Sequence, residues 1–194
     1  MGAAQETRSR IVDACVQQAS VGGLEGLTIG SLATRLGMSK AGVIGPFGSK
    51  EKLQIATLER AVSLFRQQVI EAARAKPAGM PRLNEVIQRW TSYLESGPFP
   101  NGCFVTAASC ELDGRPGVLR DRLRDMIRLW QDFLRAEIEV AQRQGSIPRT
   151  LVPEDVVFVW TGVIMAANQE IQLMGSTGAV SRARRLMRAA IQAE

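Results

Sequence analysis

The stretch TIGSLATRLGMSKAGVIGPFGSKEKL, Thr28–Leu53, decides the fold of the N-terminal part of this 194-residue chain. Apolar residues in Ile29–Leu36 recur at i, i+3, i+4 and i+7, which is the spacing of one helix face. Thr28 is a favourable N-cap residue and Gly37 closes the helix. A second short helix is expected at Ser39–Gly45 after a tight turn. Two short helices joined in this way form a helix-turn-helix, whose second helix reads DNA.

Helical spacing of apolar residues continues along the rest of the chain, and no sustained alternation of period two interrupts it. The sequence therefore predicts an all-α fold. The other expected helices are Thr7–Ser20, Ser49–Ala75, Leu83–Ser96, Cys103–Glu111, Gly117–Gln144, Val156–Leu173 and a last one along Val180–Ile191.

Composition narrows the function. The chain has 24 Lys and Arg against 19 Asp and Glu, a net charge of +5 that allows a polyanionic partner without requiring one. It has no histidine, which removes the commonest general base and metal ligand, so we expect neither an enzyme nor a metal or cofactor site.

The cysteines and the apolar runs of the sequence indicate the cellular location. Cys15, Cys103 and Cys110 are odd in number and lack zinc-site spacing, which favours a reducing cytoplasm. No apolar run follows Met1, so no signal peptide is expected. The apolar run Val156–Ala167 is too short to span a bilayer. A soluble cytoplasmic protein without a membrane partner is predicted.

The quoted stretch resembles the DNA-binding region of the TetR family of transcriptional regulators. The likeness comprises an amphipathic first helix, a glycine loop before Thr28, Gly37-Met38-Ser39, and the run from Phe47 through Ser49-Lys50-Glu51 to Leu53. A second segment, GCFVTAASCELDGRPGVLRD at Gly102–Asp121, resembles one subgroup of these regulators. The resemblance implies nine helices: a three-helix helix-turn-helix DNA-binding domain at 1–52, and a helical ligand-binding and dimerisation domain at 53–194.

The chain departs from the family near the end of the second short helix. Where the family usually has an aromatic residue and, two positions later, His or Tyr, this chain has Ile44 and Pro46 with Gly45 between them. Two phosphate contacts are therefore expected to be missing. The N-terminal residues of the second helix are the ones that contact base edges. Because Pro46 ends the helix after these residues, Ser39–Val43 can still enter the major groove.

Candidate DNA-binding residues follow from the motif and the family pattern. They are Thr28, Ser39, Lys40, Ala41, Gly42, Val43 and Lys50. Thr28 and Ser39 stand at helix N-termini, where hydroxyl and N–H groups bind phosphate, although both can serve only as caps. Lys40 reaches a guanine or a phosphate, or is merely solvated. Ala41 and Val43 are placed to touch a thymine methyl, although the pattern favours a core position for Val43.

Candidate ligand-pocket residues are the larger apolar side chains of the body. They are Phe65, Val69, Trp90, Phe104, Met126, Trp130, Phe133 and Trp160, together with Asn168 as a polar group that orients a ligand. For each aromatic residue the alternative is ordinary core packing, and for Asn168 a structural hydrogen bond. Glu137 hints at a cationic ligand or has no ligand role.

A dimer interface is expected on the last two helices. Gly162 and Ala166 are small residues one turn apart that permit close helix approach, and the resemblance implies a four-helix seam. Its residues are Val159, Gly162, Val163, Ala166, Ala183, Leu186, Met187 and Ala190. The alternative is that this apolar surface is the core of a monomer. A two-fold dimer implies a pseudo-palindromic operator.

Two functions remain open. The first is a ligand-responsive regulator, a repressor, that binds a double-stranded DNA operator as a homodimer and is released by a small-molecule effector. The second is a helical dimer that has weakened or lost operator binding and holds a small molecule or a protein partner. An all-α enzyme is a third class, which the absence of histidine disfavours.

Overall fold

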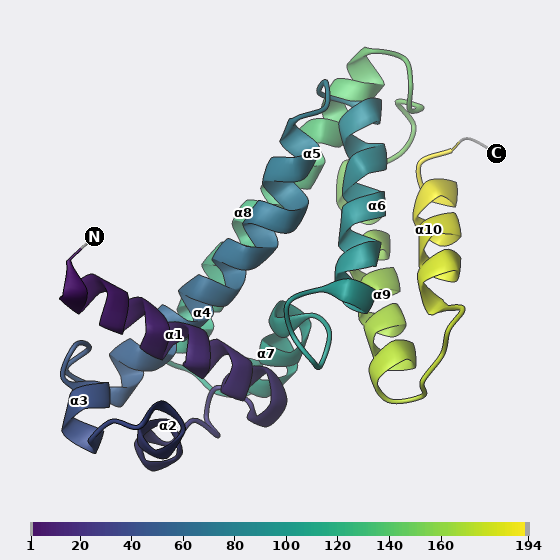
Figure 1. Cartoon of the computed structure of the whole chain (residues 1–194). Helices are drawn as coiled ribbons and strands as arrows, with labels where there is room; N and C mark the ends of the chain where they lie inside the picture. The colour runs from purple at the N-terminus through teal and green to yellow at the C-terminus, as the bar shows by residue number, and fades with distance from the viewer. Residues whose placement is uncertain (1, 193–194) are drawn as a thin grey trace. The chain divides into compact units, whose positions relative to one another are not determined.

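The computed structural model describes residues 2–192, and within that range every regular element is a helix (Figure 1). If the continuous run α4–η1–α5 is counted once, the described residues form nine helices, so the all-α prediction is confirmed. None of these helices combines the length and apolarity that crossing a bilayer requires.

The described residues form two compact units. One contains the chain up to Leu64 together with Phe99–Arg124, and the other contains Phe65–Pro98 together with the chain from Asp125 onward. The sequence predicts a boundary after residue 52, between a DNA-binding domain and a ligand-binding domain. This predicted boundary does not coincide with the division into packed units, and it stays a prediction.

The first unit holds the helix-turn-helix. Its elements are α1 (Ala3–Gly22), α2 (Ile29–Leu36), α3 (Lys40–Ile44), most of α4 (Lys50–Phe65) and α7 (Phe104–Leu112). Its core is made of aliphatic side chains that are fully buried, among them Ile11, Leu24, Leu32, Val43 and Leu53. Burial of one apolar stripe from each short helix is what holds α2 and α3 in place.

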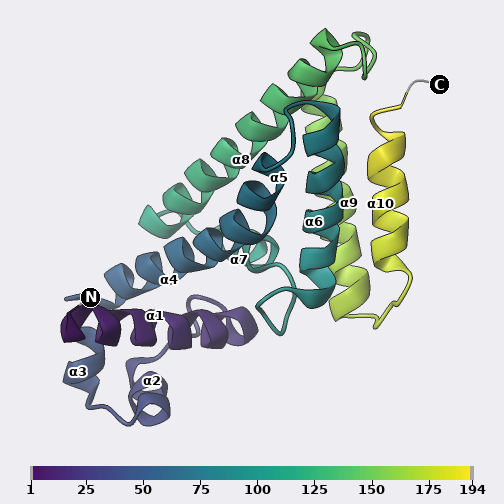
Figure 2. The same ribbon diagram turned by 45° about the horizontal axis from the view of Figure 1, so that its top comes forward.

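The second unit is a helical body. Its elements are η1 (Arg66–Glu71), α5 (Ala72–Arg74), α6 (Met80–Ser96), most of α8 (Val118–Arg143), α9 (Pro153–Gln172) and α10 (Ala179–Ala189). Helices α6, α9 and α10 lie side by side, as Figures 1 and 2 both show. Polar bonds add to this packing, because the Arg184 guanidinium of α10 donates to the hydroxyls of Thr91 (2.9 Å) and Ser92 (2.8 Å) on α6.

Several helices differ at their ends from the sequence-based expectation. Helix α6 begins at Met80 rather than Leu83, and α9 begins at Pro153 rather than Val156. In both cases a proline lies in the first turn, where its missing N–H has no intrahelical partner to lose. The expected single helix Ser49–Ala75 contains a π-helical segment, η1, which periodicity did not indicate.

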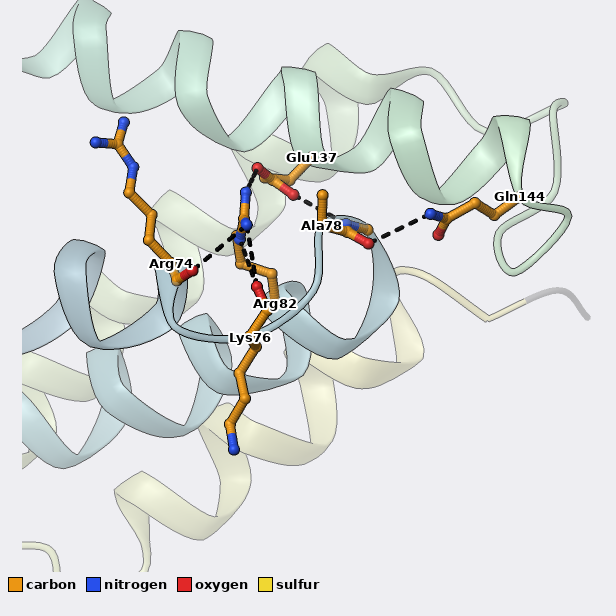
Figure 3. Close-up of polar contacts among 7 residues, drawn as sticks. Arg74, Lys76, Ala78, Arg82, Glu137 and Gln144 are labelled. Atoms are coloured by element: carbon orange, nitrogen blue, oxygen red, sulfur yellow. Dashed lines mark hydrogen bonds and ion pairs between the residues drawn. The ribbon is translucent and has the colours of Figure 1, made fainter.

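A buried ion pair holds the turn between α5 and α6 against α8 (Figure 3). The Glu137 carboxylate accepts from Arg82 Nη1 at 2.5 Å and from the Gly79 N–H at 2.9 Å. Arg82 also donates to the Lys76 carbonyl from Nε (3.1 Å) and Nη2 (3.0 Å). Gly79 has φ +87°, so this turn depends on glycine. Because both its oxygens are bonded, Glu137 serves the fold, and the hint of a cationic ligand is not supported.

Candidate nucleic-acid interface and helical body

The turn between α2 and α3 is built as the sequence predicts. The Thr28 hydroxyl accepts from the Ser31 N–H at 3.2 Å, and the Ser39 hydroxyl accepts from the Gly42 N–H at 3.0 Å. Gly37 adopts φ +64°, the left-handed conformation that ends α2. Both caps are therefore in use, which confirms the expected helix starts and satisfies N–H groups that would otherwise need another acceptor.

Helix α3 is five residues long and ends at Ile44, immediately before Gly45 and Pro46. The Ile44 carbonyl then accepts from the N–H groups of Phe47 and Gly48, each at 2.9 Å. Phe47 is buried, and the Arg8 guanidinium of α1 lies 4.7 Å from its ring centroid. The helix thus ends after the residues that are expected to contact base edges, and the start of α3 is intact.

Side chains of two helices, α7 and α4, form hydrogen bonds with the backbone of the loop between α1 and α2. The Glu111 carboxylate of α7 accepts from the Leu24 N–H (2.9 Å) and the Glu25 N–H (2.8 Å). From α4, Gln54 Nε2 donates to the Leu24 carbonyl (2.9 Å) and Lys50 Nζ donates to the Glu25 carbonyl (3.2 Å). This loop leads directly into Thr28, so its geometry fixes where α2 begins.

Sequence reasoning did not find Arg8, Gln54 and Glu111 as supports of the helix-turn-helix. The available signals were a glutamine among apolar residues in α4 and a lone carboxylate at the end of the apolar α7. Neither signal indicates which residue the side chain bonds to. The two hydrogen bonds of Glu111, for example, join residues 86 and 87 positions apart in the chain.

Most of the predicted DNA-binding residues lie at the surface. Thr28, Ser39, Lys40, Ala41 and Lys50 are exposed, and Gly42 is half-buried. Val43 is an exception, because its side chain is fully buried. It belongs to the core, so a thymine contact by Val43 is not supported.

Four of the predicted pocket residues gather in the second unit. The rings of Phe65, Trp90, Trp130 and Phe133 form one cluster, which also contains Tyr93, a residue that sequence reasoning missed. We call these five residues the aromatic cluster. Its members come from α4, α6 and α8, so these three helices pack against one another through large aromatic side chains.

The remaining pocket candidates lie elsewhere. Phe104 belongs to the first unit, where its ring packs 5.5 Å from that of Phe99 and lines a cleft of about 430 Å³ beside Glu111. Trp160 is fully buried and donates from Nε1 to the Met187 carbonyl at 2.8 Å, so it joins α9 to α10 as a core residue. Val69 is fully buried in η1, and Met126 and Asn168 are half-buried.

The predicted dimer residues divide by burial. Val159, Gly162, Ala166 and Leu186 are exposed, and Val163 and Ala190 are half-buried. Ala183 and Met187 are buried within the chain's own packing of α10, so their side chains do not lie on a free surface. Phe158 and Met165 of α9, which the prediction omitted, are exposed apolar residues of this region, Phe158 to 79%.

A helix-turn-helix unit and a separate helical body together define a class of helix-turn-helix DNA-binding proteins. The sequence profile described as "Tetracyclin repressor-like, C-terminal domain" matches residues 79–187, which is more than half of the chain. The chain therefore belongs to the TetR family of transcriptional regulators, whose members are regulators rather than enzymes. No curated protein matches the sequence significantly.

Solved structures of other regulators share the fold. A TetR transcriptional regulator from Chloroflexus aurantiacus superposes with a TM-score of 0.90 at 22% identity, covering 99% of this chain and 98% of the other. AibR, crystallised with isovaleryl coenzyme A and operator DNA, gives 0.77 at 19% identity, with 95% and 98% covered. A transcriptional regulator from Saccharomonospora viridis in complex with choline gives 0.74 at 22% identity, with 95% of each chain covered.

Proposed function

We propose that this protein is a ligand-responsive transcriptional repressor that binds a pseudo-palindromic DNA operator as a homodimer. The observation that carries the proposal is the intact start of α3: Ser39, Lys40 and Ala41 are exposed at a capped N-terminus while Val43 anchors the helix in the core. In a helix-turn-helix, these first residues of the second helix meet the base edges.

In this proposal, contacts to base edges and contacts to phosphates are made by different residues. Ser39, Lys40, Ala41 and Gly42 lie in the major groove, and Thr28 and Lys50 contact phosphates. Lys50 supports this division because its Nζ already donates to the Glu25 carbonyl, which places the ammonium group beside the loop that leads into α2. The DNA-binding domain then comprises residues 1–52, and residues 53–194 bind the effector and dimerise.

The homodimer is proposed to form through α9 and α10. Phe158, Val159, Gly162, Met165 and Ala166 recur at helical spacing on α9 and are all exposed, and Leu186 of α10 is exposed as well. A surface of this kind is characteristic of an interface, because soluble chains seldom leave a large contiguous apolar patch in water. A two-fold axis there presents two reading helices to one operator.

The proposal is tested by selecting binding sites from random duplexes with the purified protein and then measuring affinity for the enriched sequence by gel shift. We expect a palindromic sequence, with affinity lost in Lys50→Ala and retained in Lys76→Ala, a lysine of the α5–α6 turn that serves as the matched control. Folded, dimeric protein that enriches no sequence would refute operator binding.

Salt dependence measures the phosphate contacts separately. If Lys40 and Lys50 each neutralise one phosphate per subunit, the slope of log K against log salt is roughly −3 to −4 for a dimer. A slope near zero would remove both lysines from the proposal, even if an operator were found.

One observation favours a second candidate, a helical dimer that no longer binds an operator. Helix α3 has only five residues, and where the family pattern has phosphate-contacting side chains this chain has Ile44, which is half-buried, and Pro46, which is exposed. The same selection experiment separates the two candidates, because this one predicts a ligand-binding dimer without any enriched sequence.

Release by an effector is proposed to be a shift between two conformations. An effector weakens operator binding only by its difference in affinity for the two conformations. The check is to measure operator affinity with and without a saturating effector. Tight effector binding that leaves operator affinity unchanged would contradict this part of the proposal.

A further inference from the structure

The aromatic cluster is a set of five rings in mutual contact within the second unit. Ring centroids are 5.0 Å apart for Trp90 and Trp130, 5.2 Å for Phe65 and Trp130, and 5.3 Å for Phe65 and Tyr93. These three pairs meet edge to face, whereas Phe133 stacks on Trp130 at 5.6 Å. Edge-to-face packing brings the edge of one ring against the face of the next, and ring faces are only weak hydrogen-bond acceptors.

Two donors are buried in this cluster without an acceptor. The indole Nε1 atoms of Trp90 and Trp130 are inaccessible to solvent and have no hydrogen-bond partner in the described structure. The third tryptophan differs, because Trp160 Nε1 donates to the Met187 carbonyl at 2.8 Å. Buried tryptophan N–H groups normally find a partner, and an unsatisfied one destabilises the protein. Two in one cluster therefore call for an explanation.

The backbone beside the cluster is irregular as well. The π-helical segment η1 begins at Arg66, directly after Phe65, and its Val69 side chain is fully buried. π-helical turns are rare and are frequently found at functional sites. The irregular turn therefore begins directly beside Phe65, whose ring contacts both tryptophans.

The charges nearby do not suit a cationic ligand. The Arg74 guanidinium already lies 5.3 Å from the Phe133 ring centroid, so one cation occupies the edge of the cluster. The carboxylate one helical turn beyond Phe133, that of Glu137, is bonded to Arg82 and to the Gly79 N–H (Figure 3). What the cluster offers is apolar ring surface and two unused N–H donors.

We propose that the aromatic cluster binds a flat, apolar molecule that carries a hydrogen-bond acceptor such as a carbonyl oxygen, to which the Trp90 or Trp130 N–H donates. This inference rests on the proposed function, because it specifies the chemical class of the effector. The rings touch one another in this structure, so the ligand selects a conformation in which they have separated. Satisfying a buried donor and covering ring surface both favour that conformation.

The test follows the three indole N–H signals of the ¹⁵N-labelled dimer by NMR, assigned with Trp90→Phe, Trp130→Phe and Trp160→Phe. The probes are 2-acetylnaphthalene and 2-isopropenylnaphthalene, which have nearly the same size and differ in a carbonyl oxygen replaced by CH₂. We expect 2-acetylnaphthalene to move the Trp90 or Trp130 proton downfield and to leave that of Trp160 in place. The isopropenyl compound should cause no such downfield shift.

Affinity provides a second readout. Replacing the tryptophan whose signal moves by Phe keeps a ring and removes the donor, so 2-acetylnaphthalene should bind about tenfold more weakly, with 2-isopropenylnaphthalene unchanged. Trp160→Phe is the matched control and should alter neither affinity.

Three results would overturn the inference. They are equal affinity for the two probes, no binding of either probe up to its solubility, or downfield Trp90 and Trp130 signals already present in the free protein, which would mean that the donors are satisfied. The titration uses no DNA, so a failed operator selection leaves its result standing. Conversely, operator binding can be confirmed while this inference fails.

Discussion

Glu137 shows how one buried side chain decides a local structure. Its carboxylate is only 8% exposed and bonds both the Arg82 guanidinium and the Gly79 N–H. Removing the carboxylate charge leaves the partly exposed Arg82 with backbone carbonyls as its acceptors, so what is lost is one charge-assisted hydrogen bond and the strong acceptor of the Gly79 N–H.

We therefore expect Glu137→Gln to lower the free energy of unfolding by about 2 kcal/mol. The measurement is urea unfolding at a fixed protein concentration. The matched control is Glu139→Gln on the same helix, whose ion pair with Arg143 is exposed and long at 3.8 Å, so its loss should change stability by less than about 0.5 kcal/mol. Equal effects of the two substitutions would contradict a structural role for the Glu137 pair.

The cysteines differ in their surroundings. Cys110 is exposed, whereas Cys15 and Cys103 are buried, and burial raises the pKa of Cys15 from its usual 9.0 to about 11. Burial raises the pKa of Cys103 as well. Since the thiolate is the reactive form, one thiol per folded chain should react rapidly with a disulfide reagent near pH 8, and Cys110→Ser should abolish that phase.

The same pKa shift of Cys15 predicts a pH dependence of stability. The unfolded chain releases this proton from about pH 9, whereas the folded chain retains it until about pH 11, so the free energy of unfolding declines over that interval and is unaffected below it. Urea unfolding at pH 8 and pH 10 should show a smaller gap between wild type and Cys15→Ala at pH 10. A constant gap would exclude a raised pKa at Cys15.

At the scale of elements, α7 supports the helix-turn-helix through the backbone of the α1–α2 loop. Glu111 bonds two consecutive N–H groups there, and a Cβ on Gly23 would lie 2.9 Å from the Glu111 carboxylate oxygens. The loop leads into Thr28, so the start of α2 depends on a helix about 80 residues away in the chain.

Glu111→Gln should loosen this loop, because an amide presents one acceptor and one donor to two N–H groups. We expect a loss of about 1 kcal/mol in stability and a several-fold weaker operator affinity, measured by thermal unfolding and gel shift. Asp113→Asn, just beyond the end of α7, is the matched control. Unchanged operator affinity in a folded Glu111→Gln protein would show that the loop contact does not influence DNA binding.

At the scale of the whole molecule, the proposed dimer surface can be tested with a charge. Phe158→Glu places a carboxylate within the proposed apolar interface, so light scattering should report a monomer and operator affinity should fall by at least tenfold. Leu129→Glu is the matched control, because Leu129 is 70% exposed on α8 and lies outside the proposed surface. A dimer that persists in Phe158→Glu would place the interface elsewhere.

The sequence by itself determined the helices and the helix-turn-helix. Caps at Thr28 and Ser39, the glycine at Gly37 and the stop at Gly45-Pro46 are local signals, because each acts on backbone groups within four residues. Periodicity likewise identified which helices exist, since one apolar face must be buried.

Tertiary structure alone decided which side chains share a site. It placed Met187 in the core, paired Trp160 with a carbonyl of α10, and assigned Phe104 to a different packed unit from the remaining aromatic candidates. It also joined Glu111 to the α1–α2 loop and left two indole donors of the aromatic cluster without acceptors. The physical reason is the same throughout: helical spacing specifies the face of a helix, whereas the partner of that face depends on contacts between residues far apart in the chain.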